Sequence, residues 1–285
     1  MHRRRQLEFA VLLAFSVLFW ASPLTRTFRL ALSNEAYTHI ILIVPLSLAL
    51  IYLESRTSPP AIKPSRLGGL FLLAAALALG GFAEWSDLLA ADVQLTVSVL
   101  AVVLWWIACV VFCFGLSYFH TFLFPVCLLF WLVPWPDSLL NQVILALQNG
   151  SVVATRWLLL LARVPVTQSG VVLSLPGGFN IEVARECSSI RSSTLLVVMT
   201  MVMAYLFLRS NWRRLIVILV AIPLAVAKNA LRIFVIVMLA MRVDPEYLNG
   251  DLHHRGGIVF LLVALAIVSA ILWLLARGET VGENK

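Results

Sequence analysis

Apolar segments of bilayer-spanning length alternate with short polar segments along most of the chain. A transmembrane helix needs about 20 mostly apolar residues, and about eight stretches approach that length. They cover residues 8–24, 38–53, 67–84, 95–114, 119–134, 190–208, 214–242 and 257–276. The pattern predicts an all-α integral membrane protein with about eight transmembrane helices in a single polytopic domain over residues 1–285.

The region after residue 134 departs from this alternation. Pro134-Trp135-Pro136 ends the fifth predicted span, since proline lacks a backbone donor and restricts the residue before it. Residues 139–161 are apolar but interrupted by Gln142, Gln148 and Arg156, among others. This pattern favours an amphipathic interfacial or re-entrant helix on the outer face over a full crossing.

Two short apolar runs follow, and both have the character of strands. Val171 to Leu175 and Phe179 to Val183 are joined by Pro176-Gly177-Gly178, which predicts a small β-hairpin outside the membrane. An extended peptide could pair with an edge of this hairpin. A loop that plugs the helical bundle is the equal alternative.

The composition also indicates a membrane protein, and the distribution of charge predicts its orientation in the membrane. Hydrophobic residues make up 61% of the chain and charged residues 12%, with a mean hydropathy of +0.98, which excludes an ordinary soluble domain. The net charge of +7 comes from basic residues between apolar spans, so we expect contact with membrane lipids and no nucleic-acid partner. Basic clusters at residues 3–5, 56–66, 209–214 and 277–285 place both termini in the cytoplasm. The first span lacks a cleavage pattern and is predicted to be retained.

Among the four cysteines, Cys187 has a distinct environment. Cys109, Cys113 and Cys127 lie inside apolar segments, where cysteine behaves as a small packing residue. Cys187 lies in the polar run 186–193, directly before an apolar segment. The cysteine spacing matches no zinc or CxxC pattern, so neither a metal nor a cofactor is predicted.

Counting helical rise places three polar groups at one depth. Cys187 precedes the cytoplasmic Arg209 by about 22 residues, or roughly 33 Å. Arg232 lies about 27 Å along the next helix, and His253 and His254 precede Arg277 by roughly 35 Å. All of them are therefore predicted to lie at the outer edge of the bilayer, each on a different one of the last three helices.

Arg232 is costly in a membrane helix and needs a polar environment. An arginine at the bilayer centre costs on the order of 2.5–3.5 kcal/mol and usually faces the bundle interior or a wet cavity. Lys228 and Asn229 precede Arg232 by four and three residues, so all three share a helical face. This favours an interior polar pocket, although a guanidinium that snorkels to the surface is the alternative.

Cysteine, arginine and histidine together suggest acyl-transfer chemistry. A cysteine near a cation and a helix N-terminus forms its thiolate readily and attacks carbonyl carbon. A histidine can take the thiol proton and return it to a leaving amine, and an arginine can stabilise the oxyanion. We therefore predict Cys187 as nucleophile, Arg232 as oxyanion stabiliser and His253 or His254 as base.

An ordered set of motifs resembles the exosortase and archaeosortase family from about residue 119 to 276. The motifs are Pro134-Trp135-Pro136, Leu147-Gln148, Glu186-Cys187-Ser188-Ser189-Ile190-Arg191-Ser192, Asn229-Ala230-Leu231-Arg232 and His253 with Gly257. The resemblance implies N-terminal helices over 1–118 and a catalytic core over 119–276. It also implies a bacterial inner-membrane enzyme, with its site on the periplasmic side. Its partner would be the C-terminal sorting signal, of the PEP-CTERM kind, on exported proteins.

The resemblance also implies roles for single residues and shows two departures. It assigns the nucleophile to Cys187, its partner to Arg232 and the third role to the histidine pair. Ser189 stands where the family commonly has glycine, and the doubled histidine leaves His253 and His254 both open.

Some functional questions stay open at the level of sequence. Arg191, Asn229 and Lys228 are candidate substrate-binding residues, because they lie on the helical faces of Cys187 and Arg232. A transporter or export component for an anionic lipid-linked polysaccharide precursor, held by Lys228 and Arg232, is the competing function. A non-catalytic export scaffold is the third possibility.

Overall fold

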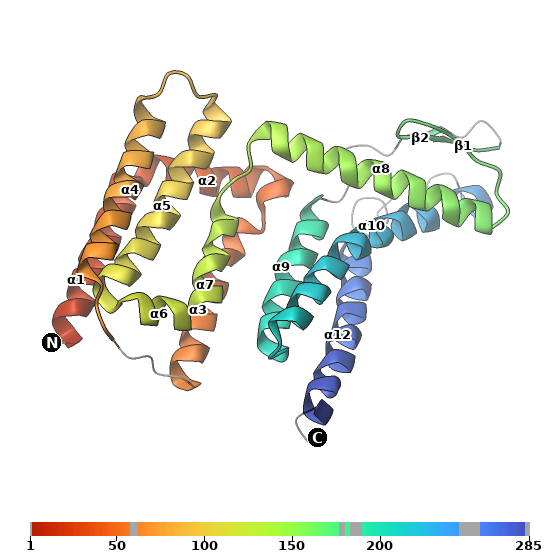
Figure 1. Cartoon of the computed structure of the whole chain (residues 1–285). Helices are drawn as coiled ribbons and strands as arrows, with labels where there is room; N and C mark the ends of the chain where they lie inside the picture. The colour runs from red at the N-terminus through yellow and green to blue at the C-terminus, as the bar shows by residue number, and fades with distance from the viewer. Residues whose placement is uncertain (1, 58–61, 177–179, 183–189, 245–256, 283–285) are drawn as a thin grey trace. The chain divides into compact units, whose positions relative to one another are not determined.

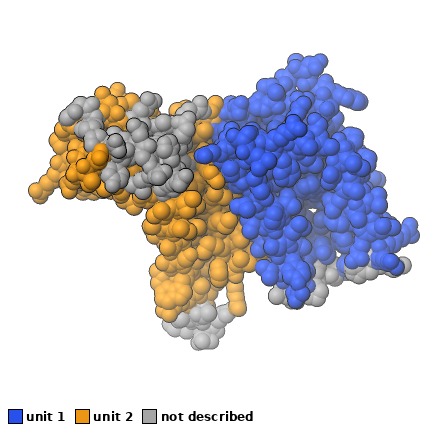
Figure 2. All heavy atoms as spheres, turned by 180° about the vertical axis from the view of Figure 1, so that it is seen from behind, with its two compact units in different colours: residues 1–140 blue, residues 141–285 orange. Residues whose placement is uncertain are grey.

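The computed structural model describes residues 2–57, 62–176, 180–182, 190–244 and 257–282. The chain divides into two compact units, Met1–Leu140 and Asn141–Lys285 (Figure 2). The first contains α1 (His2–Phe19), α2 (Ala21–Ser33), η1 (Glu35–Tyr37), α3 (Ile40–Thr57), α4 (Arg66–Trp85), α5 (Ala91–Phe114), α6 (Leu116–Thr121), α7 (Leu123–Leu128) and η2 (Leu129–Leu132). Helix α8 (Asp137–Leu161) begins in the first unit and lies mostly in the second. The rest of the second contains β1 (Thr167–Ser169), β2 (Val172–Ser174), β3 (Asn180–Glu182), α9 (Ile190–Phe207), α10 (Asn211–Arg242) and α12 (Gly257–Gly282).

The predicted class of an all-α membrane protein with about eight spans is confirmed. Seven helices among the described residues are long and apolar enough to cross a bilayer, and the bent pair α1–α2 would make eight. Helix α12 shows the apolar exterior that such a helix needs, since large side chains on it are exposed. Examples are Ile258 at 67%, Leu262 at 61% and Leu274 at 62% exposure. These surfaces suit contact with lipid.

Two predicted spans are wrong in detail, and each is broken shortly before a proline. The stretch 8–24 is broken at Trp20, where α1 and α2 meet with a bend of 73°. The stretch 119–134 is broken at Phe122, and the apolar helix that follows covers only Leu123–Leu132. Each break lies three residues before a proline, Pro23 or Pro125, whose missing N–H removes the next helical hydrogen bond.

Close backbone contacts hold the first unit together. A Cβ on Gly69 of α4 would lie 2.5 Å from the Cα of Phe112 on α5, so the glycine permits the two helices to touch. Trp20, at the α1–α2 corner, packs with Trp105 of α5 at a ring-centroid distance of 5.5 Å. The buried cluster around these residues is formed almost entirely by α4, α5 and the α1–α2 corner.

The Pro134-Trp135-Pro136 corner before α8 is fixed by hydrogen bonds within the first unit. Tyr37 Oη donates to the carbonyl oxygen of Trp135 at 2.9 Å, and Thr96 Oγ1 donates to that of Pro134 at 2.9 Å. The Asp92 carboxylate accepts from the backbone N–H of Asp137, the first residue of α8, at 2.8 Å. The prediction that this corner ends one helix is confirmed, and the corner also begins the next.

Helix α8 is continuous from Asp137 to Leu161 and runs crosswise to α9 and α12 in the second unit (Figure 1). By length and apolarity it could cross a membrane. The prediction that residues 139–161 form an interfacial or re-entrant helix stays a prediction.

The predicted β-hairpin is confirmed and gains a strand. β2 pairs antiparallel with β3, with Leu173 opposite Ile181, as the two apolar runs predicted. β1 adds on the other side of β2, with Ser169 opposite Val172 across a tight turn, where Gly170 has a φ of 60°. The sheet order is β1-β2-β3.

The sheet packs on α8 and on the second half of α10. Leu173 and Leu175 of the hairpin join a buried cluster with α8 and α10, which includes Val152 and Ile233. The second half of α10 therefore lies beside α8, whereas its first half packs with α9 and α12. Pro223 lies between these halves and removes one backbone donor inside the helix.

Candidate functional site

Three polar side chains of α10 are buried on one side of the helix. Lys228 is 6% exposed, Asn229 1% and Arg232 9%, although the surrounding buried residues of α10 are apolar. The expectation that these residues face the bundle interior is therefore met. The alternative, in which the Arg232 guanidinium snorkels to an exposed surface, disagrees with this burial.

Helix α8 supplies the first part of that environment. Gln148, Ser151 and Thr155 are buried at 4%, 0% and 0% exposure, and their spacing places them on one face of α8. Asn229 Nδ2 donates a hydrogen bond to Ser151 Oγ at 2.9 Å. Thr155 Oγ1 donates to the carbonyl oxygen of Ala230 at 3.3 Å.

A glycine lets α8 and α10 approach at this level. A Cβ on Gly150 would lie 3.1 Å from Cγ1 of Val226, which is tighter than an ordinary contact. Small residues commonly permit such approaches between membrane helices. The hydrogen bonds of Asn229 and Thr155 therefore join the two helices near this point of close approach.

The second part of the environment is the first turn of α9. Lys228 Nζ donates a hydrogen bond to Ser192 Oγ, and both groups are buried. Ser193 is also buried, at 5% exposure, and its hydroxyl has no hydrogen-bond partner among the described residues. Arg191 is exposed at this end of α9, and its predicted role in substrate binding stays a prediction.

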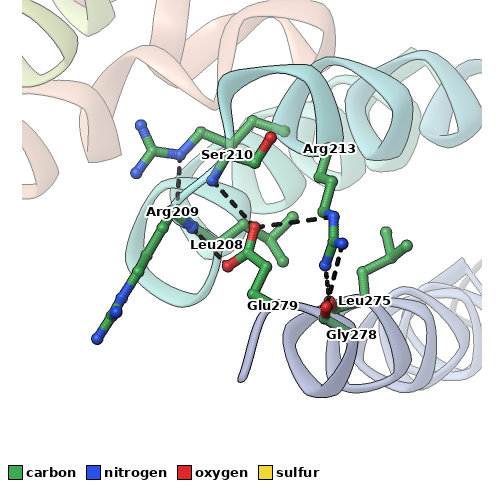
Figure 3. A network of polar contacts seen from close by, with 8 residues as sticks. Leu208, Arg209, Ser210, Arg213, Leu275, Gly278 and Glu279 are labelled. Carbon is green, nitrogen blue, oxygen red and sulfur yellow. Dashed lines mark hydrogen bonds and ion pairs between the residues drawn. The ribbon is translucent and has the colours of Figure 1, made fainter. Parts of the chain in front are cut away.

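The opposite ends of α9 and α12 are held together by one carboxylate (Figure 3). Glu279 of α12 accepts from the backbone N–H groups of Arg209 and Ser210 at 2.9 and 3.0 Å. Arg213 of α10 donates to the carbonyl oxygens of Leu275 and Gly278 at 2.5 and 3.2 Å. Because the C-terminal ends of α9 and α12 meet here and the helices pack together, both helices begin at the other end of the bundle.

The predicted nucleophile and base lie outside the described residues. Cys187 precedes Ile190, the first residue of α9, by three positions, and His253 and His254 precede Gly257, the first residue of α12, by four and three. The chain therefore enters α9 from the segment with Cys187 and α12 from the segment with the histidines, both at the end where Lys228 contacts Ser192.

The remaining cysteines and histidines have simpler environments. Cys109 and Cys113 are buried in α5, as the packing interpretation predicts, but Cys127 is exposed, so that interpretation is wrong for Cys127. His39 is buried with its ring edge-on to Trp131. Within the described ranges, no group of three His, Cys, Asp or Glu side chains could hold a metal ion.

Sequence reasoning missed the polar face of α8 and the role of Ser192. The signal for the first was present, since Gln148, Ser151 and Thr155 recur at the three- and four-residue spacing of a helix face. The role of Ser192 depends on its hydrogen bond with Lys228, which lies 36 positions away in the chain. No local sequence pattern could indicate this contact.

One family model matches most of the chain. It is described as a transmembrane exosortase of the EpsH type and covers residues 20–270, so the match extends well before the region in which the motifs lie. The search of curated proteins and the search of solved structures found no match. Membership implies a multi-pass membrane protein that processes sorting signals. The chain belongs to the transmembrane exosortase family.

Proposed function

We propose that this exosortase is a membrane-embedded cysteine protease or transpeptidase that cleaves a C-terminal sorting signal, of the PEP-CTERM type, from exported proteins. The main support is the position of Arg232. It is a buried guanidinium, one helical turn after Lys228, and Lys228 contacts the first turn of the helix that Cys187 precedes.

The residues supply a complete acyl-transfer cycle. The Cys187 thiol gives its proton to His253 or His254, and the sulfur attacks the carbonyl carbon of the scissile peptide bond. Arg232 donates hydrogen bonds to the oxyanion of the tetrahedral intermediate. The C–N bond then breaks, the leaving amine takes the proton from the histidine, and a thioester remains on Cys187. Water or an acceptor amine attacks the thioester and restores the thiol.

The proposed orientation places this chemistry on the outer side of a bacterial inner membrane, with both termini in the cytoplasm. Arg209, Arg213 and Arg214 then lie on the cytoplasmic side, as the positive-inside rule favours. A membrane-impermeant thiol reagent should label Cys187 in intact spheroplasts. Labelling of Cys187 only after permeabilisation would overturn the orientation.

Processing of a signal-bearing protein tests the chemistry. In cells that express the chain together with an exported protein carrying a Pro-Glu-Pro tail, Cys187→Ser should abolish the size change of that protein. Cys127→Ser is the matched control, because Cys127 is exposed and lies in the other unit. On α10, Arg232→Gln should abolish processing, whereas Arg242→Gln, an exposed arginine at the end of the same helix, should not.

The same variants separate the competing functions. A transporter or export component for an anionic lipid-linked precursor would tolerate Cys187→Ser and depend on Arg232 and Lys228. Unchanged processing by Cys187→Ser would therefore refute the protease. Single replacements of His253 and His254 by Gln should identify the base, since only one of them should abolish processing.

A further inference from the structure

The three residues Lys228, Asn229 and Ala230 tie α10 to two other helices. Lys228 binds Ser192 of α9 through its ammonium group, and Asn229 binds Ser151 of α8 through its amide. The carbonyl oxygen of Ala230 accepts a second bond from α8. We call these contacts the three-helix clasp.

The clasp lies directly before Arg232 in the chain. Lys228 and Arg232 are four residues apart, so they are separated by about 6 Å along the helix axis and point to the same side. A rotation or slide of α10 that broke the clasp would move the Arg232 guanidinium with it. The clasp therefore fixes the position of Arg232 relative to the first turn of α9.

The polar atoms that form the clasp are buried and already engaged with protein. Asn229 and Ser151 are 1% and 0% exposed, and the Lys228–Ser192 contact is also buried. Buried polar groups are costly unless they are hydrogen-bonded. Each contact therefore has a strong preference for one relative position of its two helices, which suits a positioning role better than a role in holding a substrate.

We propose that Ser192 and Lys228 are positioning residues, which hold Arg232 of α10 at a fixed position relative to the start of α9 without touching the substrate. This inference rests on the proposed function, because Arg232 and Cys187 must act together for their spacing to matter. It assigns Lys228 a role different from substrate binding, and the two roles predict different kinetics.

Kinetics distinguish the roles because positioning acts on the transition state. A displacement of about 1 Å in a catalytic group can cost about 100-fold in rate. Ser192→Ala should therefore lower kcat about 10- to 100-fold and leave KM within about 2-fold for a synthetic peptide with the sorting tail. Ser192→Thr retains a hydroxyl and should restore most of kcat.

The next residue offers a matched control. Ser193→Ala removes a hydroxyl of the same size, from the same turn and at similar burial, but that hydroxyl has no hydrogen-bond partner among the described residues. Ser193→Ala should keep kcat near the unsubstituted value. Equal kcat values for Ser192→Ala and Ser193→Ala, or a rise confined to KM in Ser192→Ala or Lys228→Met, would overturn the proposal.

A second readout needs no substrate. The rate of Cys187 alkylation by iodoacetamide against pH, followed by mass spectrometry of its peptide, reports how strongly nearby cations favour the thiolate. Ser192→Ala and Lys228→Met should each shift this profile to higher pH, and the double variant should shift it no further than Lys228→Met alone. If the variants keep the native melting temperature and the pH dependence of Cys187 alkylation does not change, the positioning role is refuted. Failure of the proposed function would be seen in a different experiment, as unchanged processing of the signal-bearing protein by Cys187→Ser.

Discussion

Glu279 is expected to stabilise the second unit far from the proposed site. Its carboxylate accepts from the backbone N–H of Arg209 at 2.9 Å and of Ser210 at 3.0 Å, in the loop between α9 and α10. Ser210 is the N-cap of α10 and makes no side-chain capping bond. In a capping box, a glutamate in the first turn of the helix accepts a hydrogen bond from the backbone N–H of the N-cap residue. Here the carboxylate of Glu279, from α12, accepts that bond from Ser210.

The expected effect of Glu279→Ala follows from these two bonds. The Arg209 amide is exposed and can bond to water instead, so its loss costs little. The Ser210 amide is partly buried, and a hydrogen bond to a charged acceptor contributes about 1.5–3 kcal/mol. Taking about 2 kcal/mol, the melting temperature should fall by about 4–8 °C, given about 2–4 °C per kcal/mol for chains of a comparable size.

Thermal melts followed by circular dichroism in detergent micelles test this expectation. Glu84→Ala is the control, because Glu84 is exposed on α4 and makes no hydrogen bond or ion pair with the described residues, so it should change the free energy of unfolding by less than about 0.5 kcal/mol. Glu279→Gln retains one oxygen acceptor and should fall between the two. The loss of the bonds to backbone amides should persist at high salt, whereas the contribution of the ion pair between Glu279 and Arg213, at 4.0 Å, should be screened. Equal melting temperatures for Glu279→Ala and Glu84→Ala would refute the reasoning.

Two further predictions concern the first unit. Gly115→Ala should destabilise the chain by about 1–3 kcal/mol. Gly115 has a φ of 97° and a ψ of 172°, and a Cβ there would lie 1.7 Å from the carbonyl oxygen of Lys63. The control is Gly81→Ala, in a helix with open space around it, which should be neutral or stabilising in the same melts. Tyr37→Phe removes the hydroxyl that donates to the carbonyl oxygen of Trp135 and should lower the free energy of unfolding by about 1 kcal/mol. Limited proteolysis between α7 and α8 should become faster. An unchanged proteolysis rate would contradict the role of this hydrogen bond in holding the corner.

Hydrophobic pattern predicted most helices of this chain, but it could not predict which prolines break them. Pro45 and Pro223 lie inside continuous helices, whereas Pro23 and Pro125 each follow a break by three residues. All four remove one backbone donor. What differs is whether neighbouring segments favour a straight helix or a corner, and that depends on packing between residues far apart in the chain, such as Trp20 against Trp105.

The sequence predicted the part of the candidate site that contains cations, because a cation in a membrane helix needs a polar environment. The cost of a buried cation predicted that Lys228 and Arg232 face the bundle interior, and both are buried there. The hydroxyl partners Ser151 and Ser192 were not predictable in the same way, because a serine in a membrane helix can bond to its own backbone at little cost. Only tertiary structure distinguishes a serine that joins two helices from one that does not.

Helix α10 also limits what helical rise can say about depth. Its 32 residues make it about 48 Å long, whereas a bilayer core of about 30 Å needs only about 20 residues. The excess length follows α8 in the second half of the helix. A count along a straight helix from Arg214 therefore does not fix the height of Arg232, and the depth of that residue depends on where α8 lies.

Helix α8 has polar residues on two faces, and they constrain its depth. One row is buried and faces α10, and it contains Gln148, Ser151 and Thr155; the other is exposed and contains Gln142, Asn149 and Arg156. An exposed arginine near the bilayer centre would cost on the order of 2.5–3.5 kcal/mol, so the exposed row favours a position in the interface. The crosswise course of α8 over α9 and α12 (Figure 1) favours the same position. Since Asn229 binds α8 directly, an interfacial α8 would bring the turn with Arg232 close to the membrane surface, as the proposed function requires.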